Sequence, residues 1–527
     1  MRDPPIHKEP DVFAEPWEAE PCEIVTAAQM QQIEARLFAA GMPEPALMEK
    51  AASQVAARLQ ALYPRTQYPR VGVLVGPGHN GGDALVVARE LHLAGYAVNR
   101  YQPLPGLKPL TADHARYADS LGIARVESWE AWGDRDLLLD GLFGLGLTRP
   151  LSDDLAAAVA ALNTGRAPRV SIDLPSGLHT DTGAVLGGAI RADRTFCLGL
   201  WKQACFQDAA LPYLGSVELL PFGIPAGDRA AILSGPPLQQ VLTPAAARAA
   251  IPLPRPAVTH KYQQGHLLVI AGSWRFAGSV LLTGLGARAS GVGMLTIAAP
   301  AALKPLLVGQ LPEALVIACP ETATGAIAHL PPELDLSAFS AIACGPGLTS
   351  EVPALIAGLV SEPGPLLLDA DGLNLLAAQP RWPALDRPGP LILTPHAGEF
   401  RRLFPGLETS DRFAAVRAAV NQSQATVLLK GARTVIAGPE APTWAIADST
   451  PALARGGSGD VLTGLLGGLL AQPGGAAAAT DRAAVAAWWH ARAGGLAAAA
   501  HTELGVDPLT LVRSEERRVG KECGFRC

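Results

Sequence analysis

Hydrophobic and polar positions along this chain form two alternating patterns, short apolar runs and longer amphipathic segments. Four runs in the first half predict strands, at 71–75, 137–140, 170–173 and 195–199. Two segments there predict helices, at 26–41 and 45–59, the first with an N-cap and a closing glycine. Six later segments each contain a predicted strand, at 265–273, 293–300, 341–347, 365–374, 390–399 and 425–438. Apolar strands separated by helices predict parallel sheets covered on both faces.

The alternation lapses between the two halves, where proline and glycine accumulate. We therefore predict an α/β domain over 24–225, a linker over 226–250 and a second α/β domain over 251–512. A chain of 527 residues is also too long for a single hydrophobic core. The halves do not repeat one another, so the pattern indicates a fusion rather than a duplication.

Composition and charge narrow the class of protein. The chain is 49% hydrophobic and 17% charged, with a net charge of −6, which gives no electrostatic indication of a nucleic-acid or anionic-membrane partner. The seven cysteines form no C-x-x-C pair, which is typical of reduced cysteines rather than of disulfides or a zinc site. The N-terminus lacks an apolar signal segment, and the most apolar stretch is too short and too interrupted to span a membrane. We expect a cytoplasmic enzyme.

The last residues differ abruptly in composition from the rest. The segment "RSEERRVGKEC", 513–523, is rich in Arg, Glu and Lys after an Ala- and Leu-rich region. Its back-translation matches a short-read sequencing adapter, which predicts that 513–527 is a non-native, adapter-derived tail. The alternative is a solvated, charged terminal extension.

A glycine-rich turn follows the first predicted strand of the first half. The glycines within 76–81 spell G-x-G-x-x-G, the dinucleotide-binding fingerprint, and indicate a Rossmann-like three-layer α/β/α domain. A dehydrogenase of this kind places an acid about 20 residues later, whereas this chain has Asn-Arg at 99–100, which leaves an NADP-type site open. His79, Asn80 and Asp83 put polar side chains where a pyrophosphate needs bare backbone. The loop predicts a binding site that differs from that of a dehydrogenase.

A second glycine-rich motif, "RGGSGDVLTGLLGGLL", lies near the C-terminus. Gly456, Gly457, Ser458 and Gly459 lead into a helix whose first amides can hold phosphoryl oxygens. Asp460 lies on the first turn, where it can take a proton from a hydroxyl during phosphoryl transfer. In isolation the string could equally be a glycine-rich helix cap.

The surrounding motifs favour phosphoryl transfer. "HKYQQGHLLVIAGS", "AGSVLLTGLGARASGVGMLTI", "CGPGL", "DADGLN" and "TPHAGEF" occur in this order between 260 and 400. With "GGSGDVLTG" they resemble the ADP-dependent NAD(P)H-hydrate dehydratases, which have a ribokinase-like α/β fold. The resemblance implies that the adenine nucleotide and Mg²⁺ are cofactors.

The same resemblance implies two groups of contact residues in the second half. The hydrated nicotinamide nucleotide would contact Ser279, Gly347, His396 and Asp460. The adenine nucleotide would contact Lys430, Gly431, Ala432, Arg433, Thr434 and Gly459. Two features depart from the family: Ser279 stands where an alanine is usual, and "STPALARGGSGD" lacks the usual Asn-Pro-Gly.

The implied reaction follows from the chemistry of the hydrate, which carries a hydroxyl at C6 of the reduced ring. Hydroxide is a poor leaving group, and phosphorylation with Asp460 as base makes a good one. Phosphate then leaves as the lone pair of the ring nitrogen forms a double bond, and NAD(P)H is restored. ADP is the expected donor, and ATP stays open.

Motifs of the first half resemble the NAD(P)H-hydrate epimerase domain. They are "LMEKAA", "GPGHNGGDALVVAR", "DGLFGLGLTRP" and "SIDLPSGLHTDTG", between about 24 and 225. The resemblance implies substrate contacts at His79, Asn80, Gly81, Gly82, Asp83, Gly144, Leu145, Gly146, Leu147, Thr148, Arg149, Pro150 and Asp173. It also implies a K⁺ site from Asn80, Asp140 and Ser176, whose oxygen ligands suit a hard cation.

Asp173 is the predicted catalytic residue of the first half. It ends an apolar strand before "PSG", where a carboxylate can be tuned for acid–base work, and one carboxylate could remove and re-add the C6 hydroxyl through a planar cation. The alternative role is a turn cap on Ser176, and Asp140 could instead anchor a loop. His79 and Ala84 depart from the usual Asn and Gly of the family.

Two other functions compete with this interpretation. A ribokinase-like kinase for a vitamin precursor would release a stable phosphorylated product. An N-terminal interaction module would have lost the polar residues of its loops, yet Asn80, Asp83, Asp140 and Asp173 are all present. We therefore predict a bifunctional repair enzyme for hydrated NADH and NADPH. Its partners would be small-molecule substrates, without nucleic acid or membrane, and it would form a homo-oligomer.

Overall fold

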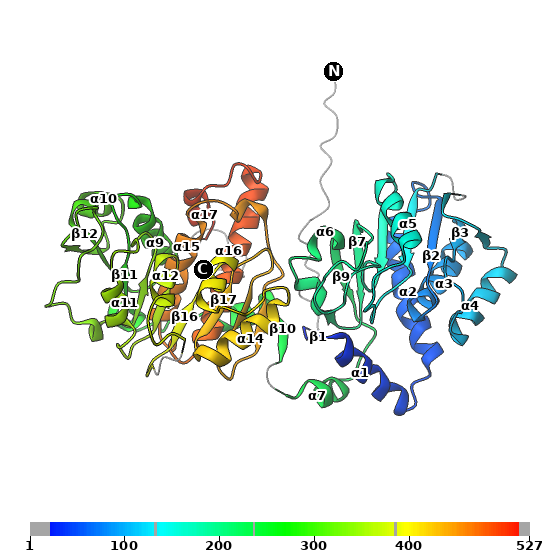
Figure 1. Ribbon diagram of the computed structural model, residues 1–527, viewed down its shortest axis with the longest axis horizontal. Coiled ribbons are helices and arrows are strands. Elements are labelled where there is room, and N and C mark those ends of the chain that lie inside the picture. Colours follow the sequence, from blue (N-terminus) through cyan, green and yellow to red (C-terminus); the bar gives the residue numbers. More distant parts are fainter. Residues whose placement is uncertain (1–21, 131–133, 236–237, 384–386, 516–527) are drawn as a thin grey trace, which may run out of the picture. The chain divides into compact units, whose positions relative to one another are not determined.

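The computed structural model describes residues 22–130, 134–235, 238–383 and 387–515. The chain forms two compact units, unit 1 over 1–235 and unit 2 over 236–527, and each is an α/β fold as predicted (Figure 1). The stretch predicted as a linker contains α7 (Ala226–Leu233) in unit 1, and β10 (Gln239–Val241) and α8 (Pro244–Ala250) in unit 2.

The sheet of unit 1 has seven parallel strands in the order β4-β3-β2-β5-β6-β7-β9. The strands are β2 (Arg70–Val75), β3 (Ala97–Tyr101), β4 (Ala124–Val126), β5 (Leu137–Gly141), β6 (Arg169–Ile172), β7 (Arg194–Leu198) and β9 (Ser216–Leu220). A separate parallel pair joins β1 (Ile24–Val25) to β8 (Trp201–Lys202). The chain runs outward from β2 in one direction and from β5 in the other, so the strand order reverses between them. In open α/β sheets ligands bind at such a switch point, beyond the carboxyl ends of the strands.

The helices of unit 1 pack on this sheet through apolar faces. They are α1 (Ala27–Ala39), α2 (Glu44–Leu62), α3 (His79–Leu93), α4 (Pro109–Ser120), α5 (Asp153–Thr164) and the short α6 (Leu211–Leu214). Thr26 and Gln29 form a capping box at the start of α1, and Gly41 follows its end with a φ of 97°. Leu155 and Val159 of α5 pack into a cluster with strand residues of the sheet. The predicted helix cap and closing glycine are confirmed.

The sheet of unit 2 has ten strands in the order β10-β19-β18-β17-β16-β15-β14-β11-β12-β13. The strands after β10 are β11 (His266–Ile270), β12 (Met294–Pro300), β13 (Leu315–Cys319), β14 (Ala341–Cys344), β15 (Leu366–Leu368), β16 (Leu391–Leu393), β17 (Thr426–Leu429), β18 (Val435–Ala437) and β19 (Thr443–Ala445). The segment from β13 to β17 is parallel, and β18 pairs antiparallel with both of its neighbours. The predicted strands form the parallel part, whereas β10, β13 and β19 were not predicted.

The remaining helices of unit 2 are α9 (Ala277–Ala289), α10 (Lys304–Gln310), α11 (Pro353–Leu359), α12 (Asp371–Ala377), α13 (Ala397–Leu403), α14 (Arg412–Ser423), α15 (Ser458–Ala471), α16 (Ala479–His501) and α17 (Pro508–Ser514). The most apolar stretch of the sequence is α15, a buried helix that packs against α9. A Cβ at Gly464 would lie 1.9 Å from the carbonyl oxygen of Thr283, so only glycine lets these helices approach so closely. Within the described part of the chain, no helix is both long and apolar enough to cross a membrane.

The predicted non-native tail begins within α17, and its residues 516–527 lie outside the described residues. Glu515 is buried, and its carboxylate lies 2.9 Å from Nδ1 of His490 on α16. The other ring nitrogen of His490 lies 3.0 Å from the hydroxyl of Ser458, the first residue of α15. The adapter origin of the tail stays a prediction.

Candidate functional site

A cavity of about 790 Å³ opens in unit 1 at the carboxyl edge of its sheet. Its wall combines the start of α3, the loop after β5, the end of β6, and side chains of α1, α2 and β8. Most of the predicted substrate contacts line it: His79, Asn80, Asp83, Gly144, Leu145, Gly146, Leu147, Thr148, Arg149 and Asp173. The predicted contacts Gly81, Gly82 and Pro150 are not part of the wall.

Glycine stands at the three positions of the fingerprint for different structural reasons. A Cβ at Gly76 would lie 1.7 Å from the carbonyl oxygen of Leu142, and one at Gly81 would lie 1.9 Å from that of Gly76. Both glycines therefore allow close backbone packing. Gly78 has no neighbour within 4 Å of such a Cβ and is the N-cap of α3, so its surface faces the opening of the cavity. The first turn of α3 thus presents backbone amides to a ligand.

Asp173 follows β6 in the left-handed backbone region, with a φ of 67°. Its carboxylate lies 2.6 Å from the ammonium group of Lys202, and the side chains of both residues are buried. Burial alone would lower the pKa of Lys202, but Asp173, Cys197 and Glu34 together outweigh it and raise the pKa above its ordinary value. The ion pair therefore holds a charged lysine and a carboxylate at the floor of the cavity. The turn-cap alternative for Asp173 is not present, because the amide of Ser176 donates instead to Asp140, at 2.8 Å.

Asp140, at the end of β5, holds two loops together. Its carboxylate accepts hydrogen bonds from the hydroxyls of Ser171 (2.8 Å) and Ser176 (2.5 Å), and from the amides of Ser176 and Leu142. Burial raises its pKa, and these hydrogen bonds oppose the rise. The loop-anchor role considered for Asp140 is therefore present in the geometry. The amide nitrogen of Asn80 is buried and makes no hydrogen bond to a described residue.

Oxygen atoms of the predicted K⁺ ligands gather beside the cavity. The hydroxyl of Ser176 lies 3.2 Å from the carbonyl oxygen of Phe143, next to the carboxylate of Asp140. A Cβ at Gly144 would lie 3.1 Å from Oδ1 of Asn80 and 3.2 Å from Oδ2 of Asp173, so these two side chains converge. Such an all-oxygen donor set fits a hard monovalent cation in type.

Two further carboxyl groups line the cavity and were not predicted as catalytic. Glu34 comes from α1, and burial raises its pKa to about 7. Asp83 comes from α3, and burial raises its pKa well above the ordinary value. Both depart from an ordinary surface carboxylate, which would be fully ionised at neutral pH.

In unit 2 the second glycine-rich motif forms the start of α15. Gly457 caps the helix with a φ of 91°, and a Cβ there would lie 2.6 Å from the side chain of Leu282. Asp460 lies on the first turn, and burial raises its pKa to about 6, although a hydrogen bond from Ser279 opposes the rise. A Cβ at Gly347 would lie 3.2 Å from Cβ of Ser279. The structure thus brings Ser279 close to both Gly347 and Asp460.

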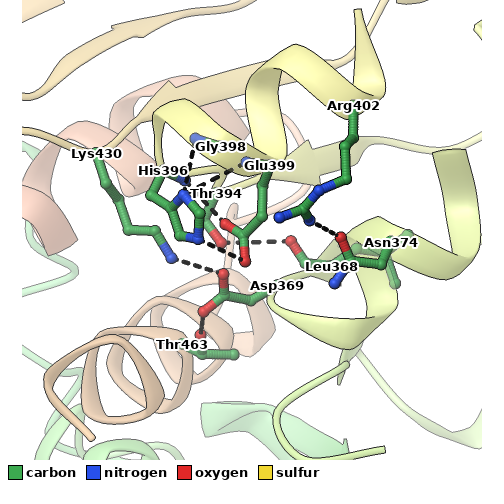
Figure 2. A network of polar contacts seen from close by, with 10 residues as sticks. All are labelled: Leu368, Asp369, Asn374, Thr394, His396, Gly398, Glu399, Arg402, Lys430 and Thr463. Atoms are coloured by element: carbon green, nitrogen blue, oxygen red, sulfur yellow. Dashed lines mark hydrogen bonds and ion pairs between the residues drawn. The ribbon is translucent and has the colours of Figure 1, made fainter. Parts of the chain in front are cut away.

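A second ion pair, whose aspartate is buried, lies next to this helix start (Figure 2). Lys430, after β17, lies 2.7 Å from Asp369, after β15, and the hydroxyl of Thr463 on α15 donates to the same carboxylate at 2.6 Å. Burial would raise the pKa of Asp369, but Lys430 and Thr463 lower it overall. A Cβ at Gly459 would lie 3.7 Å from Nζ of Lys430. The lysine therefore points toward the start of α15, where phosphoryl oxygens would bind.

His396 caps α13 at the same edge of the sheet. Its Nδ1 accepts hydrogen bonds from the amides of Gly398 (2.9 Å) and Glu399 (3.3 Å), and its own amide donates to the carboxylate of Glu399 (Figure 2). Its Nε2 lies 3.4 Å from that carboxylate, and the ring is more than half exposed. The ring is thus held by its own helix and stays accessible to a ligand.

The predicted nucleotide segment begins at Lys430 and continues around the turn to β18. Gly431 and Ala432 are exposed, the side chain of Arg433 donates to the hydroxyl of Ser449 at 2.6 Å, and that of Thr434 donates to the carbonyl of Gly431. Residues 431–434 form the turn between β17 and β18. Lys430 alone is placed beside Asp369.

Sequence reasoning missed the groups that pair with or surround the predicted carboxylates. They are Glu34 and Lys202 in unit 1, and Asp369, Glu399 and Thr463 in unit 2. Asp369 and Glu399 lie within quoted motifs, "DADGLN" and "TPHAGEF", so their spacing after predicted strands could have found them. Glu34 and Lys202 lie in segments with no motif. The only feature that could have marked Lys202 as a site residue is a positive charge within an apolar stretch.

Comparisons with known proteins match both units. A family model described as YjeF-related protein N-terminus matches residues 44–204, and one described as NAD(P)H-hydrate dehydratase matches residues 267–517. The bifunctional NAD(P)H-hydrate repair enzyme Nnr of Synechocystis sp. is 59% identical over 485 residues, covering 92% of each chain. The enzyme of the same name from Thermosynechococcus vestitus is 54% identical, covering 93% of this chain and 96% of its own. A solved structure of the ADP/ATP-dependent NAD(P)H-hydrate dehydratase of Bacillus subtilis, co-crystallised with ATP and Mg²⁺, is 32% identical, with a TM-score of 0.47, over 54% of this chain and 98% of its own.

Proposed function

This chain belongs to the family of bifunctional NAD(P)H-hydrate repair enzymes, and we propose that unit 1 epimerises the hydrates while unit 2 dehydrates the S form. The observation that carries the proposal is that each unit places a lysine paired with a buried aspartate, and a separate carboxyl group of raised pKa, at the carboxyl edge of its parallel strands. Charged groups held in this way serve acid–base chemistry on a bound small molecule.

In unit 1 the cavity would hold the hydrated nicotinamide ring near Asp173. The carboxylate, fixed by Lys202, would stabilise the planar cation that forms when the C6 hydroxyl leaves. The amides at the start of α3 would bind the phosphates of the nucleotide. The hydroxyl can then return to either face of the ring, which interconverts the R and S forms.

In unit 2 the start of α15 would hold the transferring phosphoryl group, with Lys430 beside it. Asp460 would take the proton of the C6 hydroxyl as that oxygen attacks the terminal phosphorus. Phosphate, a better leaving group than hydroxide, then leaves from C6 as the lone pair of the ring nitrogen forms a double bond to C6. Loss of a proton from C5 then gives NAD(P)H. The pKa of about 6 suits Asp460 to act as a base at neutral pH.

The proposal includes three accessory components. ADP is the expected phosphoryl donor, and would give AMP and phosphate. Mg²⁺ bound with the nucleotide would neutralise charge on its phosphates. K⁺ would be held in unit 1 by the oxygen atoms of Asn80, Asp140 and Ser176, where it would fix the loop after β5. The expected homo-oligomer stays a prediction, which sedimentation of the full chain would test.

The test is recovery of NAD(P)H absorbance from a mixture of R and S hydrates with ADP, Mg²⁺ and K⁺. We expect the wild-type chain to restore both forms, because unit 1 supplies unit 2 with S hydrate. Asp173→Ala should restore the R form no faster than spontaneous exchange allows, and Asp460→Ala should restore neither. Loss of a catalytic proton-transfer group typically costs about 10²–10⁴-fold in rate.

Two outcomes would contradict the proposal. If the wild-type chain consumes nucleotide on another alcohol and releases a stable phosphate ester, unit 2 is a kinase. If the R form is restored at the same rate by wild type and Asp173→Ala, unit 1 does not use this carboxylate. Replacing ADP by ATP in the same assay determines the donor, and removing K⁺ determines whether unit 1 needs the cation.

A further inference from the structure

Glu34 occupies an unusual place for a charged residue. On α1, residues 30, 33 and 37 form the buried face of the helix, and position 34 lies on the same face by helical spacing. Glu34 therefore points inward, and its side chain lines the cavity that also holds Asp173. A glutamate at a core-facing position of an amphipathic helix is costly unless the site uses it.

The carboxyl group of Glu34 has no partner that would commit it to a structural role. Among the residues that the structure describes, none donates a hydrogen bond to it or forms an ion pair with it. By contrast, Asp173 is paired with Lys202, and Asp140 accepts four hydrogen bonds. Of these three carboxyl groups, Glu34 is the one whose oxygens are available to a ligand in the cavity.

Charged groups on five neighbouring elements surround it. Lys202 and Lys108 favour its ionised form, whereas Asp173 and Glu44 oppose ionisation, and Asp83 on α3 is in turn influenced by Glu34. Burial is the largest effect, and together they raise the pKa of Glu34 to about 7. Glu34 can therefore hold a proton at neutral pH and also release it.

The ion pair of Asp173 makes a single-carboxylate mechanism difficult. The carboxylate of Asp173 lies 2.6 Å from the buried ammonium group of Lys202, so this ion pair already engages it. Burial raises the pKa of Asp83 well above its ordinary value, and the charges of Asp173 and Glu34 add to the rise. Loss of hydroxyl from C6 needs a proton donor, and the paired Asp173 is not free to serve as one.

We propose that Glu34 is the catalytic acid of unit 1, donating its proton to the C6 hydroxyl of the hydrate while Asp173 remains the carboxylate. This inference rests on the proposed epimerisation. The proton of Glu34 passes to the hydroxyl oxygen, the C6–O bond breaks, water leaves, and the lone pair of the ring nitrogen forms a double bond to C6. A water molecule then adds to C6 and gives a proton to the carboxylate left on Glu34, which restores the acid. No oxidant or further reactant is needed.

The experiment follows conversion of purified R hydrate to S hydrate by chromatography, without nucleotide so that unit 2 is silent. Initial rates between about pH 5.5 and 8.5 are corrected for spontaneous exchange, and kcat and KM are separated. The variants are Glu34→Gln, which mimics the protonated carboxyl group, and Glu34→Asp. Glu127→Gln is the matched control, because Glu127 is exposed and lies outside the cavity.

We expect wild type and Glu127→Gln to lose activity as the pH rises through about 7, since deprotonated Glu34 cannot donate. Glu34→Gln should lose about 10²-fold in kcat with little change in KM, and the decline above neutral pH should disappear. Glu34→Asp should recover part of the rate with the decline moved along the pH axis. Dehydration of S hydrate with ADP should be unchanged in all of these chains.

Several results would overturn the inference. One is a kcat for Glu34→Gln within about three-fold of wild type, and another is an effect of this variant on KM alone. A third is a rate for Glu34→Asp that declines at the same pH as that of wild type. If the last variant keeps the wild-type decline while Asp83→Asn removes it, Asp83 is the acid. If the wild-type chain does not accelerate conversion at all, the proposed epimerisation itself fails, independently of Glu34.

Discussion

Each unit pairs a lysine with a buried aspartate at the carboxyl edge of its sheet, Lys202 with Asp173 and Lys430 with Asp369. Each also has a carboxyl group of raised pKa nearby, but the surroundings of that group differ. Glu34 lies in the middle of α1, its carboxyl group makes no hydrogen bond to any residue within the described ranges, and burial raises its pKa to about 7. Asp460 lies on the first turn of α15, accepts a hydrogen bond from Ser279, and has a pKa of about 6.

The difference shows how a similar set of groups can serve opposite proton transfers. A helix start and a hydrogen bond both favour an anion, so Asp460 is largely a carboxylate at pH 7 and can act as a base. Glu34 lies neither at a helix start nor within hydrogen-bond distance of a described donor, so a fraction of the molecules keeps this carboxyl group protonated at that pH. Burial is the largest cause of both raised pKa values, and the higher ordinary pKa of glutamate, 4.5 against 3.8 for aspartate, contributes to the difference between the two groups.

The largest expected effect comes from breaking the two lysine–aspartate pairs. Lys202→Met leaves the carboxylate of Asp173 buried and unpaired, so it should lower the free energy of unfolding of unit 1 by about 3–5 kcal/mol. Lys430→Met should cost unit 2 less, because the side chain of Lys430 is more exposed. Thermal or denaturant unfolding of the full chain, followed with a probe in each unit, measures both losses.

The double variant Asp173→Asn with Lys202→Met is the control for this prediction, since it removes both charges and should recover part of the stability. Equal losses in the two units would show that the different burial of the two pairs does not affect stability. No recovery in the double variant would show that the loss does not come from an unpaired buried charge.

The next effect is an opposite pH dependence of the two activities. Asp460 must be deprotonated to act, so dehydration of S hydrate should fall as the pH drops through about 6. Glu34 must be protonated to donate, so epimerisation should fall as the pH rises through about 7. Separate assays of each step across this range test the comparison directly. If both activities declined in the same direction of pH, the comparison between Asp460 and Glu34 would be contradicted.

The smallest expected effect is that of Ser279→Ala. Loss of the hydrogen bond to Asp460 removes support for the carboxylate, so the pKa of Asp460 should rise and the acid limb of dehydration should move up by about one pH unit. The rate well above the limb should change little, because the base itself is intact. Ser337→Ala, at an exposed serine away from the site, is the matched control. If the pH at which dehydration declines did not change, the hydrogen bond from Ser279 would not affect the pKa of Asp460.

The sequence predicted the central parallel strands of both sheets, such as β2, β5 and β6 in unit 1 and β11, β14 and β15 in unit 2, because each strand and its following loop are local patterns. The glycine motif at 76–81, Asp140, Asp173 and Asp460 all follow or begin such elements, so spacing along the chain was enough to single them out. Strands at the sheet edges, such as β4, β10 and β13, are partly exposed, and their weak apolar pattern did not predict them.

The sequence by itself thus determined the fold class, the glycine-rich turns and the carboxylates that end strands, since these depend on local periodicity and backbone freedom. Only the tertiary structure decided which charges meet. Lys202 reaches Asp173 across 29 positions, and Lys430 reaches Asp369 across 61, through the order of strands in the sheets. Glu34 enters the cavity through the packing of α1, which no local pattern encodes. Ionisation depends on burial and on neighbours distant in sequence, so the acid–base properties of both sites emerge only on folding.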